Sequence, residues 1–300
     1  MKKWLKWSGI VVGAVIVAGA AAVLVGVQLG ERKLARKVEV PTVPIVLSAD
    51  PAKLELGRYL FNSRGCAECH GASGGGHEVI KSGSMLVVAP NITPGPDSVT
   101  RNYQPADWAR TIRHGVRPDG RPLMIMPSED YNRMSDDDVA ALVVYTKQLP
   151  PLPGNPAVIQ LPLPMKLLYA AGIVHDSSEP INHALPPEQA VPAAVTAEYG
   201  AYVAKNCAGC HGAQFSGGKI PGGPPNWPAA ANLTPGKGSA MTAYATPQAL
   251  AAMFRSGQRP NGTAINKVMP FQSLKELNDT DVFALYAYLK TLLPRDAGLR

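Results

Sequence analysis

One short pattern occurs twice in this chain and constrains its fold more than any other feature. Cys-Ala-Glu-Cys-His at residues 66–70 returns as Cys-Ala-Gly-Cys-His at 207–211, an offset of 141. Further landmarks return in the same order at offsets of 141 to 143: Asn-Ile-Thr-Pro-Gly at 91–95, Gly-Val-Arg-Pro-Asp-Gly at 115–120, Met126-Pro127 and the stretch 136–145. A nearly constant offset over five landmarks predicts two copies of one domain.

Each copy carries signals for three helices. The first is expected before the cysteine motif, at 54–62 and 196–205. The second begins at a proline and is closed by a glycine, at 105–114 and 247–256. The third begins at an N-cap, Ser135 or Asn278, and stops before a proline. The 29 Gly and 29 Pro residues indicate long loops between these helices. We therefore expect an all-α fold of two tandem, loop-rich domains.

The N-terminal segment predicts a membrane-spanning helix. Residues 8–29 contain no charge, and about 20 apolar residues suffice to cross a bilayer. Trp4 and Trp7 lie where interfacial aromatic residues belong. The alternative is a cleaved signal peptide with Ala-Gly-Ala at 18–20 as its cleavage site, but the apolar run continues for nine more positions. Lys and Arg flank both ends, so charge alone does not orient the segment.

The net charge of +7 suggests nucleic acid as a partner until it is divided by segment. Residues 1–37 hold seven basic residues and one acidic residue, a net of +6, which leaves +1 for residues 38–300. The basic character belongs to the flanks of the anchor. We therefore expect no nucleic-acid partner, and a membrane as the partner of these basic flanks.

The repeated cysteine motif has the attachment signature of a c-type haem. In such motifs the two thiols form thioethers, and the following histidine is the proximal ligand of the iron. The sequence thus predicts two covalently bound haem c groups, held by Cys66, Cys69 and His70 in one copy and by Cys207, Cys210 and His211 in the other. We weighed three alternatives. These are disulfides, a thioredoxin-like redox pair, which lacks its βαβ context here, and structural zinc, which needs two close pairs of cysteines.

The second axial iron ligand is predicted to be Met126 in the first copy and Met269 in the second. They occupy equivalent repeat positions, and each precedes a proline. The alternative is that they are core filler, the commonest role of methionine. Met124 competes locally, but its counterpart is Lys267. The remaining histidines, none with a counterpart in the other copy, are interpreted as exposed or hydrogen-bonded: His77, His114, His175 and His183.

Two further repeated features are expected at the rim of each site. Side chains of the Asn-x-Thr pairs are expected to hold a loop through hydrogen bonds to the backbone; these are Asn91 with Thr93 and Asn232 with Thr234. Arg117 and Arg259 fit either haem propionates or a surface salt bridge.

Together these motifs resemble class I cytochromes c, and particularly the cytochrome c subunits of bacterial membrane-bound alcohol and gluconate dehydrogenases. The resemblance covers roughly residues 50–150 and 195–295. It implies one haem on Cys66, Cys69, His70 and Met126, and another on Cys207, Cys210, His211 and Met269. The chain differs from those subunits in having two such domains rather than three, and an N-terminal rather than a C-terminal anchor.

The expected organisation has four parts: the anchor and its flanks at 1–37, a cytochrome c domain at 38–150, a Pro-rich connector at 151–194 and a second cytochrome c domain at 195–300. One apolar stretch of the connector, 165–174, could form a short helix. In the family, haem of this kind is attached outside the bacterial cytoplasmic membrane. The resemblance therefore implies a single-pass protein with its haem domains on the periplasmic side.

Electron transport is the predicted function. The protein is expected to relay single electrons between a dehydrogenase or quinol-oxidising complex and a downstream oxidase or cytochrome, without being a catalyst itself. A dihaem peroxidase-like enzyme is the alternative, and it needs one iron with an open or displaceable ligand. A third hypothesis is a structural anchor that recruits partners through its connector.

Overall fold

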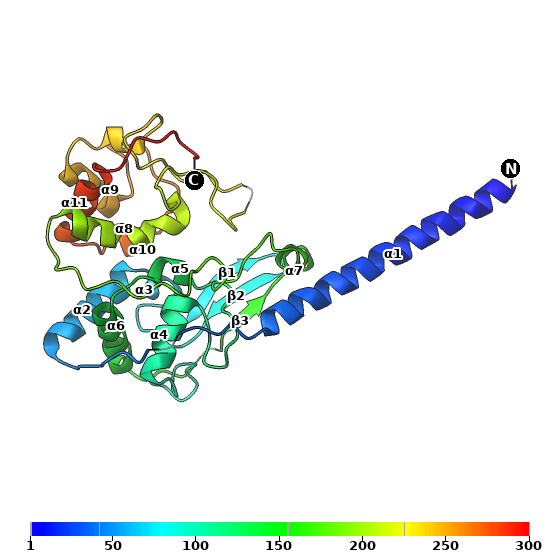
Figure 1. Cartoon of the computed structure of the whole chain (residues 1–300), viewed down its shortest axis with the longest axis horizontal. Coiled ribbons are helices and arrows are strands. Elements are labelled where there is room, and N and C mark those ends of the chain that lie inside the picture. The colour runs from blue at the N-terminus through cyan, green and yellow to red at the C-terminus, as the bar shows by residue number, and fades with distance from the viewer. Residues whose placement is uncertain (1, 42, 155, 225, 300) are drawn as a thin grey trace.

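The computed structural model describes residues 2–41, 43–154, 156–224 and 226–299. A long N-terminal helix, α1 (Lys2–Ala35), projects from a body made of two helical halves (Figure 1). Its segment Lys6–Ala35 is long and apolar enough to cross a membrane, with a mean hydropathy of 2.8 and none of its most apolar window buried. These properties are those of a membrane-spanning helix and equally those of a signal sequence.

In each half, two helices cross in close contact. In the first half these are α2 (Pro51–Ser63) and α6 (Asp136–Gln148); in the second they are α8 (Ala197–His211) and α11 (Asp279–Leu289). A Cβ at Gly57 would lie 2.0 Å from the carbonyl oxygen of Ala141, and one at Gly200 would lie 1.9 Å from that of Ala284. Only glycine permits so close an approach. The repeat seen in the sequence is thus a repeat of packing geometry.

The expected helix boundaries are largely confirmed. Ser135 and Asn278 cap the N-termini of α6 and α11 through their side chains. The middle helices, α4 (Pro105–His114) and α9 (Pro247–Ser256), end at Gly115 and Gly257, whose φ angles of 62° and 68° lie in the left-handed region. Short elements complete the two halves: α5 (Ser128–Tyr131), η1 (Ala240–Ala243) and α10 (Phe271–Leu274).

The two halves differ just before the cysteine motif. In the second half, α8 continues through Cys207, Cys210 and His211. In the first half, α2 ends at Ser63 and a separate short helix, α3 (Cys66–His70), carries the motif. Arg64 and Gly65 are an insertion of two residues between them, and Gly65 turns the chain with a φ of 86°.

The expectation of an all-α fold is wrong in one region. β1 (His77–Ser82) and β2 (Met85–Ala89) form an antiparallel hairpin, and β3 (Val158–Gln160) pairs with β2. The hairpin sequence Val-Ile-Lys-Ser-Gly-Ser-Met-Leu-Val-Val is rich in β-branched residues around a glycine turn, which favours strands. The third strand comes from the connector, with Val87 opposite Ile159. In the second half the corresponding stretch, as far as residues 218–224 and 226–230 are described, forms an isolated bridge between Gly218 and Ala230.

The apolar stretch of the connector does form a helix, α7 (Leu163–Ala170). It packs against α1 rather than against either helical core. Each half has its own core. Leu60, Phe61 and Val143 lie in the first, and Val203, Phe254 and Leu285 lie in the second.

Candidate haem sites

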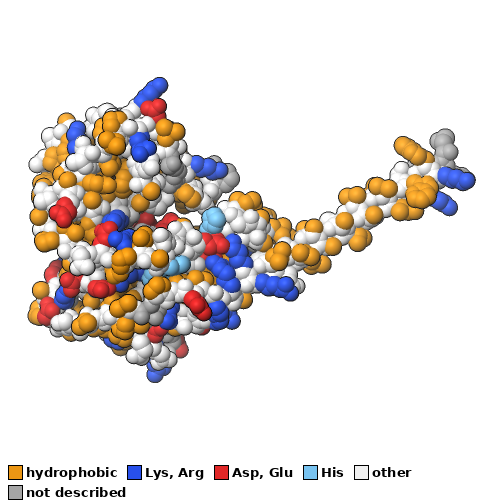
Figure 2. Space-filling view, viewed as in Figure 1, with side chains coloured by type: hydrophobic (Ala, Val, Ile, Leu, Met, Phe, Trp, Pro, Cys, Tyr) orange, Lys and Arg blue, Asp and Glu red, His pale blue; other side chains and the backbone are white. Residues whose placement is uncertain are grey.

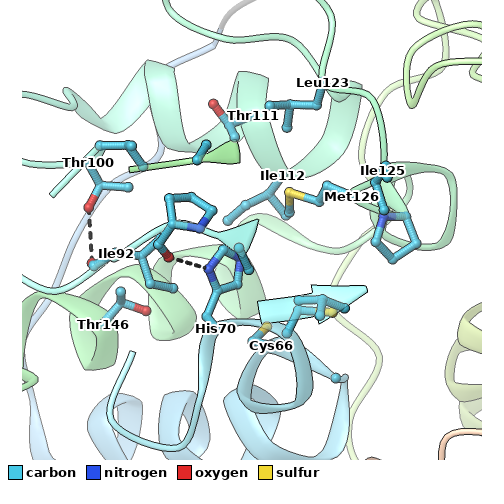
Figure 3. Close-up of a pocket in the computed structure, with 18 of the residues that line it drawn as sticks. Cys66, His70, Ile92, Thr100, Thr111, Ile112, Leu123, Ile125, Met126 and Thr146 are labelled. Carbon is cyan, nitrogen blue, oxygen red and sulfur yellow. Dashed lines mark hydrogen bonds between the residues drawn. The ribbon is translucent and has the colours of Figure 1, made fainter. Parts of the chain in front are cut away.

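The first half encloses an apolar cavity of about 230 Å³. Cys66, Cys69 and His70 line one part of it, and Met126 lines another. Figure 3 shows the imidazole of His70 and the thioether of Met126 directed toward the same space. The remaining wall comes from α4, α6 and all three strands; it includes Trp108, Ile112, Leu142, Val79, Val87 and Ile159. The sheet that the sequence did not predict is therefore a wall of this site.

Backbone hydrogen bonds orient the motif histidines. Nδ1 of His70 lies 2.9 Å from the carbonyl oxygen of Pro90, and Nδ1 of His211 lies 2.8 Å from that of Ala231. As the donor to such a carbonyl, Nδ1 carries the proton, and Nε2 is then the ring's metal-binding nitrogen. Burial also lowers the pKa of His70, which favours the neutral form that metals require.

The cysteines are placed for attachment to a group inside each half. No disulfide joins the four cysteines, and burial raises the pKa of both Cys66 and Cys207 to about 12. Both lie at the edge of their core, together with the motif alanine and the predicted methionine ligand. Met126 and Met269 are therefore equivalent in space as well as in sequence. Each lies just before the proline that starts a short helix, α5 or α10.

The loops beside the motifs are held as expected. Asn91 accepts a hydrogen bond from the backbone N–H of Thr93 at 2.8 Å and donates one to the carbonyl of Leu152 at 3.0 Å. The second copy repeats both bonds: Asn232 accepts from the N–H of Thr234 at 2.9 Å and donates to the carbonyl of Arg295 at 2.8 Å. All four polar side chains are buried, at 2% exposure or less. The two repeated loops thus tie the motif region to the chain that follows α6 and α11.

A buried donor without a partner tests whether this cavity suits haem. The indole Nε1 of Trp108 has no hydrogen-bond partner, although the residue is only 6% exposed and lines the cavity. A buried unsatisfied N–H is costly, so it indicates a missing acceptor. An apolar cavity with two thiols, an imidazole, a thioether and one such donor fits a haem, which is a flat apolar ring with carboxylate substituents.

The other candidate residues have local roles. Arg117 pairs with Asp119 at 3.1 Å, and Arg259 donates to the carbonyl of Ala264 at 2.9 Å. These contacts favour bracing of their own loops over the propionate role. Met124 does line the cavity and so remains a competitor of Met126. Of the histidines, only His70 is among the residues that line this cavity, whereas His114 pairs with His183 and His175 pairs with Glu179.

Sequence reasoning missed an approximate two-fold arrangement between the halves. The hydroxyl of Tyr59 accepts from the N–H of Asn278 and donates to Asp281, at 3.2 and 2.7 Å. In the contact related to it by this approximate two-fold, Tyr202 accepts from the N–H of Ser135 at 3.0 Å and donates to Asp138. These residues repeat at an offset of 143. The repeated tyrosine and aspartate were the signal that could have revealed the contact.

The haem-attachment helices take part in the same arrangement. Ser273 donates to Glu68 inside the first motif at 2.7 Å, and the N–H of Gly209 inside the second motif donates to Asp130 at 3.0 Å. Burial, together with the nearby charge of Glu129, raises the pKa of Asp130 to about 7. Each motif therefore contacts the opposite half of the molecule.

The inserted Arg64 breaks this symmetry. Its guanidinium lies 2.7 Å from Asp281, and the two side chains are 3% and 0% exposed. Burial alone would lower the pKa of Arg64, but the attraction of Asp281 outweighs it and the pKa is raised. The interface thus contains one fully buried ion pair, close to the first motif.

A C-x-x-C-H helix beside an apolar site with an oriented histidine defines a c-type cytochrome. Two family comparisons agree with this class. Residues 52–145 match the family described as cytochrome c oxidase, cbb3-type, subunit III, and residues 197–293 match the family described as cytochrome c. The chain therefore contains two cytochrome c domains and carries two covalently bound haem c groups with their iron.

Curated relatives point to the same class. The chain is 34% identical over 140 residues to the fructose dehydrogenase cytochrome subunit of Gluconobacter japonicus, covering 44% of this chain and 29% of that protein. It is 34% identical over 102 residues to the cytochrome c subunit of a quinone alcohol dehydrogenase from Gluconobacter oxydans, covering 32% and 21%. It is 26% identical over 276 residues to the gluconate 2-dehydrogenase cytochrome c subunit of Pantoea cypripedii, covering 83% and 62%. The chain thus spans less than a third of the first two relatives. These names give the peroxidase alternative no support.

Proposed function

We propose that this chain is a membrane-anchored dihaem cytochrome that relays single electrons between a dehydrogenase or quinol-oxidising complex and a downstream acceptor such as a terminal oxidase. In this proposal Cys66 and Cys69 form the thioethers to one haem, with His70 and Met126 as iron ligands. Cys207 and Cys210 hold the other haem, with His211 and Met269 as ligands. The haem iron supplies the redox chemistry by alternating between its ferrous and ferric states.

The chain's own residues prepare each site for electron transfer rather than substrate chemistry. The carbonyls of Pro90 and Ala231 hold the histidine rings in one orientation, which limits rearrangement on a change of iron charge. The wall of the first site is apolar, and a thioether ligand would favour the reduced state. His70 with Met126, and His211 with Met269, would each occupy both protein-facing positions of a bound iron and leave none for a peroxide or another substrate.

The observation that carries the proposal is the contact between the two attachment motifs and the opposite halves. Glu68 of the first motif and Gly209 of the second both hydrogen-bond across the interface. Covalently held groups at these motifs would therefore lie near one interface of fixed geometry. This supports electron exchange between the two haems within one chain, as a relay requires.

Anchoring and location are part of the proposal. We infer that residues 1–37 form an uncleaved anchor and its flanks, with the N-terminus in the bacterial cytoplasm and the body in the periplasm. Residues 38–150 and 195–300 are assigned to the two haem domains, and 151–194 to the connector. The length and hydropathy of α1 and the site of haem attachment in the family support this topology.

The partner classes follow from the relatives. Fructose, alcohol and gluconate dehydrogenases name three of them, so a dehydrogenase is the proposed electron donor. The second domain, 195–300, carries ten basic and five acidic residues, which favours an acidic partner surface there. An oxidase or a cytochrome is the proposed acceptor.

Haem stoichiometry tests the proposal directly. Two haems per chain should survive denaturing electrophoresis, because thioether bonds resist solvent extraction. Cys69→Ala and Cys210→Ala should each reduce the number to one, measured by pyridine haemochrome absorbance per chain. Haem that leaves with acidified solvent from the unaltered protein would contradict the central assignment.

Axial ligation is tested separately. Met126→Ala and Met269→Ala should each remove about half of the sulfur-to-iron charge-transfer absorbance of the oxidised protein, since each removes one of two thioether ligands. Met124→Ala is the matched control and should leave the band intact. Loss of about half of this absorbance in Met124→Ala, with full absorbance retained in Met126→Ala, would reassign the first ligand to Met124.

A further inference from the structure

The helix α7 crosses α1 inside the apolar segment of α1. A Cβ at Gly26 would lie 2.5 Å from Cδ2 of Leu167, and one at Gly30 would lie 3.0 Å from the carbonyl oxygen of Lys166. The two helices therefore touch at a face of α1 without side chains. Gly26 lies three residues before the end of the charge-free run 8–29. At 1.5 Å rise per residue, this is about 5 Å inside that end.

Polar contacts lock α7 in this position. Arg36 of the segment after α1 lies 2.6 Å from Asp176, whose side chain is fully buried. Tyr169 of α7 is also fully buried and donates to the same carboxylate at 2.6 Å. Lys33 pairs with Glu179 at 2.7 Å. Burial disfavours the charged form of Asp176, but the hydrogen bonds from Arg36 and Tyr169 outweigh this effect and hold the pKa of Asp176 below its usual value. The connector is thus fixed to the end of α1.

α7 and the turn that follows it also expose large apolar side chains. Leu163, Leu168 and Ile173 are 48%, 37% and 64% exposed. Lys166, the one charged residue of the helix, pairs with Glu31 of α1. Figure 2 shows hydrophobic side chains that continue from α1 onto the adjoining edge of the body. The exposed apolar surface of α7 is therefore continuous with that of the anchor.

The depth of α7 in the bilayer indicates that lipid covers its exposed apolar side chains. If α1 crosses a bilayer along residues 8–29, its contact with α7 lies at the level where acyl chains meet headgroups. Interfacial helices bury their apolar face about 5–10 Å into that boundary. The basic residue Arg32 follows at headgroup level, where anionic lipids attract it.

We propose that α7 and the turn through Ile173 lie in the interfacial layer of the membrane that α1 crosses, with Leu163, Leu168 and Ile173 inserted among the lipid chains. This inference rests on the anchor part of the proposed function. Two membrane contacts at fixed geometry hold the body at one tilt to the membrane plane, whereas a single helix followed by a loop would let it swing.

Lipid photocrosslinking of the full haem-loaded chain tests the inference. The protein is reconstituted in vesicles of phosphatidylcholine and phosphatidylglycerol that contain a phospholipid with a diazirine in its acyl chain, and labelled peptides are mapped by mass spectrometry. We expect labels on residues 8–29 and on residues 163–173. Leu168→Gln combined with Ile173→Gln should lower the labelling of 163–173 about tenfold, because two apolar side chains no longer insert.

The matched control is Val195→Gln combined with Leu293→Gln, which alters two exposed apolar residues of the body far along the chain from α7. It should leave both sets of labels unchanged, and haem content should be two in every variant. Labels on 8–29 without labels on 163–173 would overturn the inference while leaving the anchor intact. An absence of labels from both would instead overturn the anchor. A parallel sample without the lipid probe is treated with an amine crosslinker, and links between the Lys166 residues of two copies would replace lipid by a second chain as the occupant.

Discussion

Asp130 is a single carboxyl group in a position to tune one haem. It lies in the first half and accepts a hydrogen bond from Gly209, inside the second attachment motif. Burial and the charge of Glu129 raise its pKa to about 7. The charge next to the second haem site therefore changes near neutral pH, and that change comes from a residue of the other domain.

We predict that the potential of the second haem falls as pH rises through about 7. Ionised Asp130 adds a negative charge, which stabilises ferric iron; a single charge in a partly screened interior corresponds to on the order of 50 mV. Asp130→Asn should abolish this step and hold the potential at its low-pH value, as measured by redox titration at several pH values. Asp137→Asn is the exposed control. An unchanged pH step in Asp130→Asn would exclude this carboxyl as its source.

The raised pKa of Asp130 also makes the free energy of unfolding depend on pH. The folded state keeps a proton on Asp130 up to about pH 7, whereas the unfolded chain loses it near its ordinary pKa of 3.8. Between these values the folded state binds more protons, so this group lowers the free energy of unfolding as pH rises. The contribution is most favourable below pH 3.8 and is lost above pH 7.

At the scale of elements, the two halves depend on one kind of helix crossing. Gly57 and Gly200 let α2 and α8 approach the backbone of α6 and α11. The two glycines occupy equivalent repeat positions, at an offset of 143. From sequence alone, a single glycine within a predicted helix indicates lower helix stability, because the helix packed against it is not known. In the structure, glycine is required at both positions because any side chain would overlap the crossing helix.

Gly57→Ala and Gly200→Ala should each destabilise one domain by about 2–3 kcal/mol, because the new methyl group would overlap a carbonyl oxygen and force the helices apart. Denaturant unfolding followed by haem absorbance measures the loss. Gly13→Ala provides the control, since a Cβ there meets nothing within 4 Å. Equal stability of Gly57→Ala and Gly13→Ala would mean that the crossing adapts without cost.

At the scale of the whole molecule, the halves are joined by contacts that repeat and by one that does not. Asp281 accepts from Tyr59, Tyr199 and Arg64, each at 2.7 Å. Its counterpart Asp138 receives Tyr202 but has no equivalent of Arg64, because the inserted residues occur only in the first half. The interface is therefore held more strongly on the side of Asp281.

We predict that Asp281→Ala costs about 3–5 kcal/mol of stability, because it leaves Arg64 buried without its partner. It should also slow electron equilibration between the haems, since the interface loosens. Asp138→Ala, the related variant without a buried arginine, should cost clearly less. Chemical denaturation and flash-induced electron exchange measure the two effects. Equal losses in the two variants would show that the ion pair adds nothing beyond the tyrosine contacts.

Local chemistry made much of this molecule predictable. The proline starts, the N-caps and the glycine ends act within a few residues, and the structure places them where the sequence indicated. Because the domain is repeated, each of these signals occurs at two equivalent positions of the sequence. It brought Met126 and Met269 forward as ligand candidates, although the structure leaves Met124 at the same cavity.

The tertiary structure decided what depends on distant partners. The hairpin 77–89 became a wall of the first haem site by pairing with Val158–Gln160, about seventy residues later. Arg64 pairs with Asp281, and α7 packs on the glycine face of α1. No local sequence pattern predicts either contact. The sequence by itself determined that this protein carries two haem c groups, since the attachment signature is local. Only the tertiary structure determined how the two sites face each other and the anchor, because such contacts arise from shape and charge brought together across the whole chain.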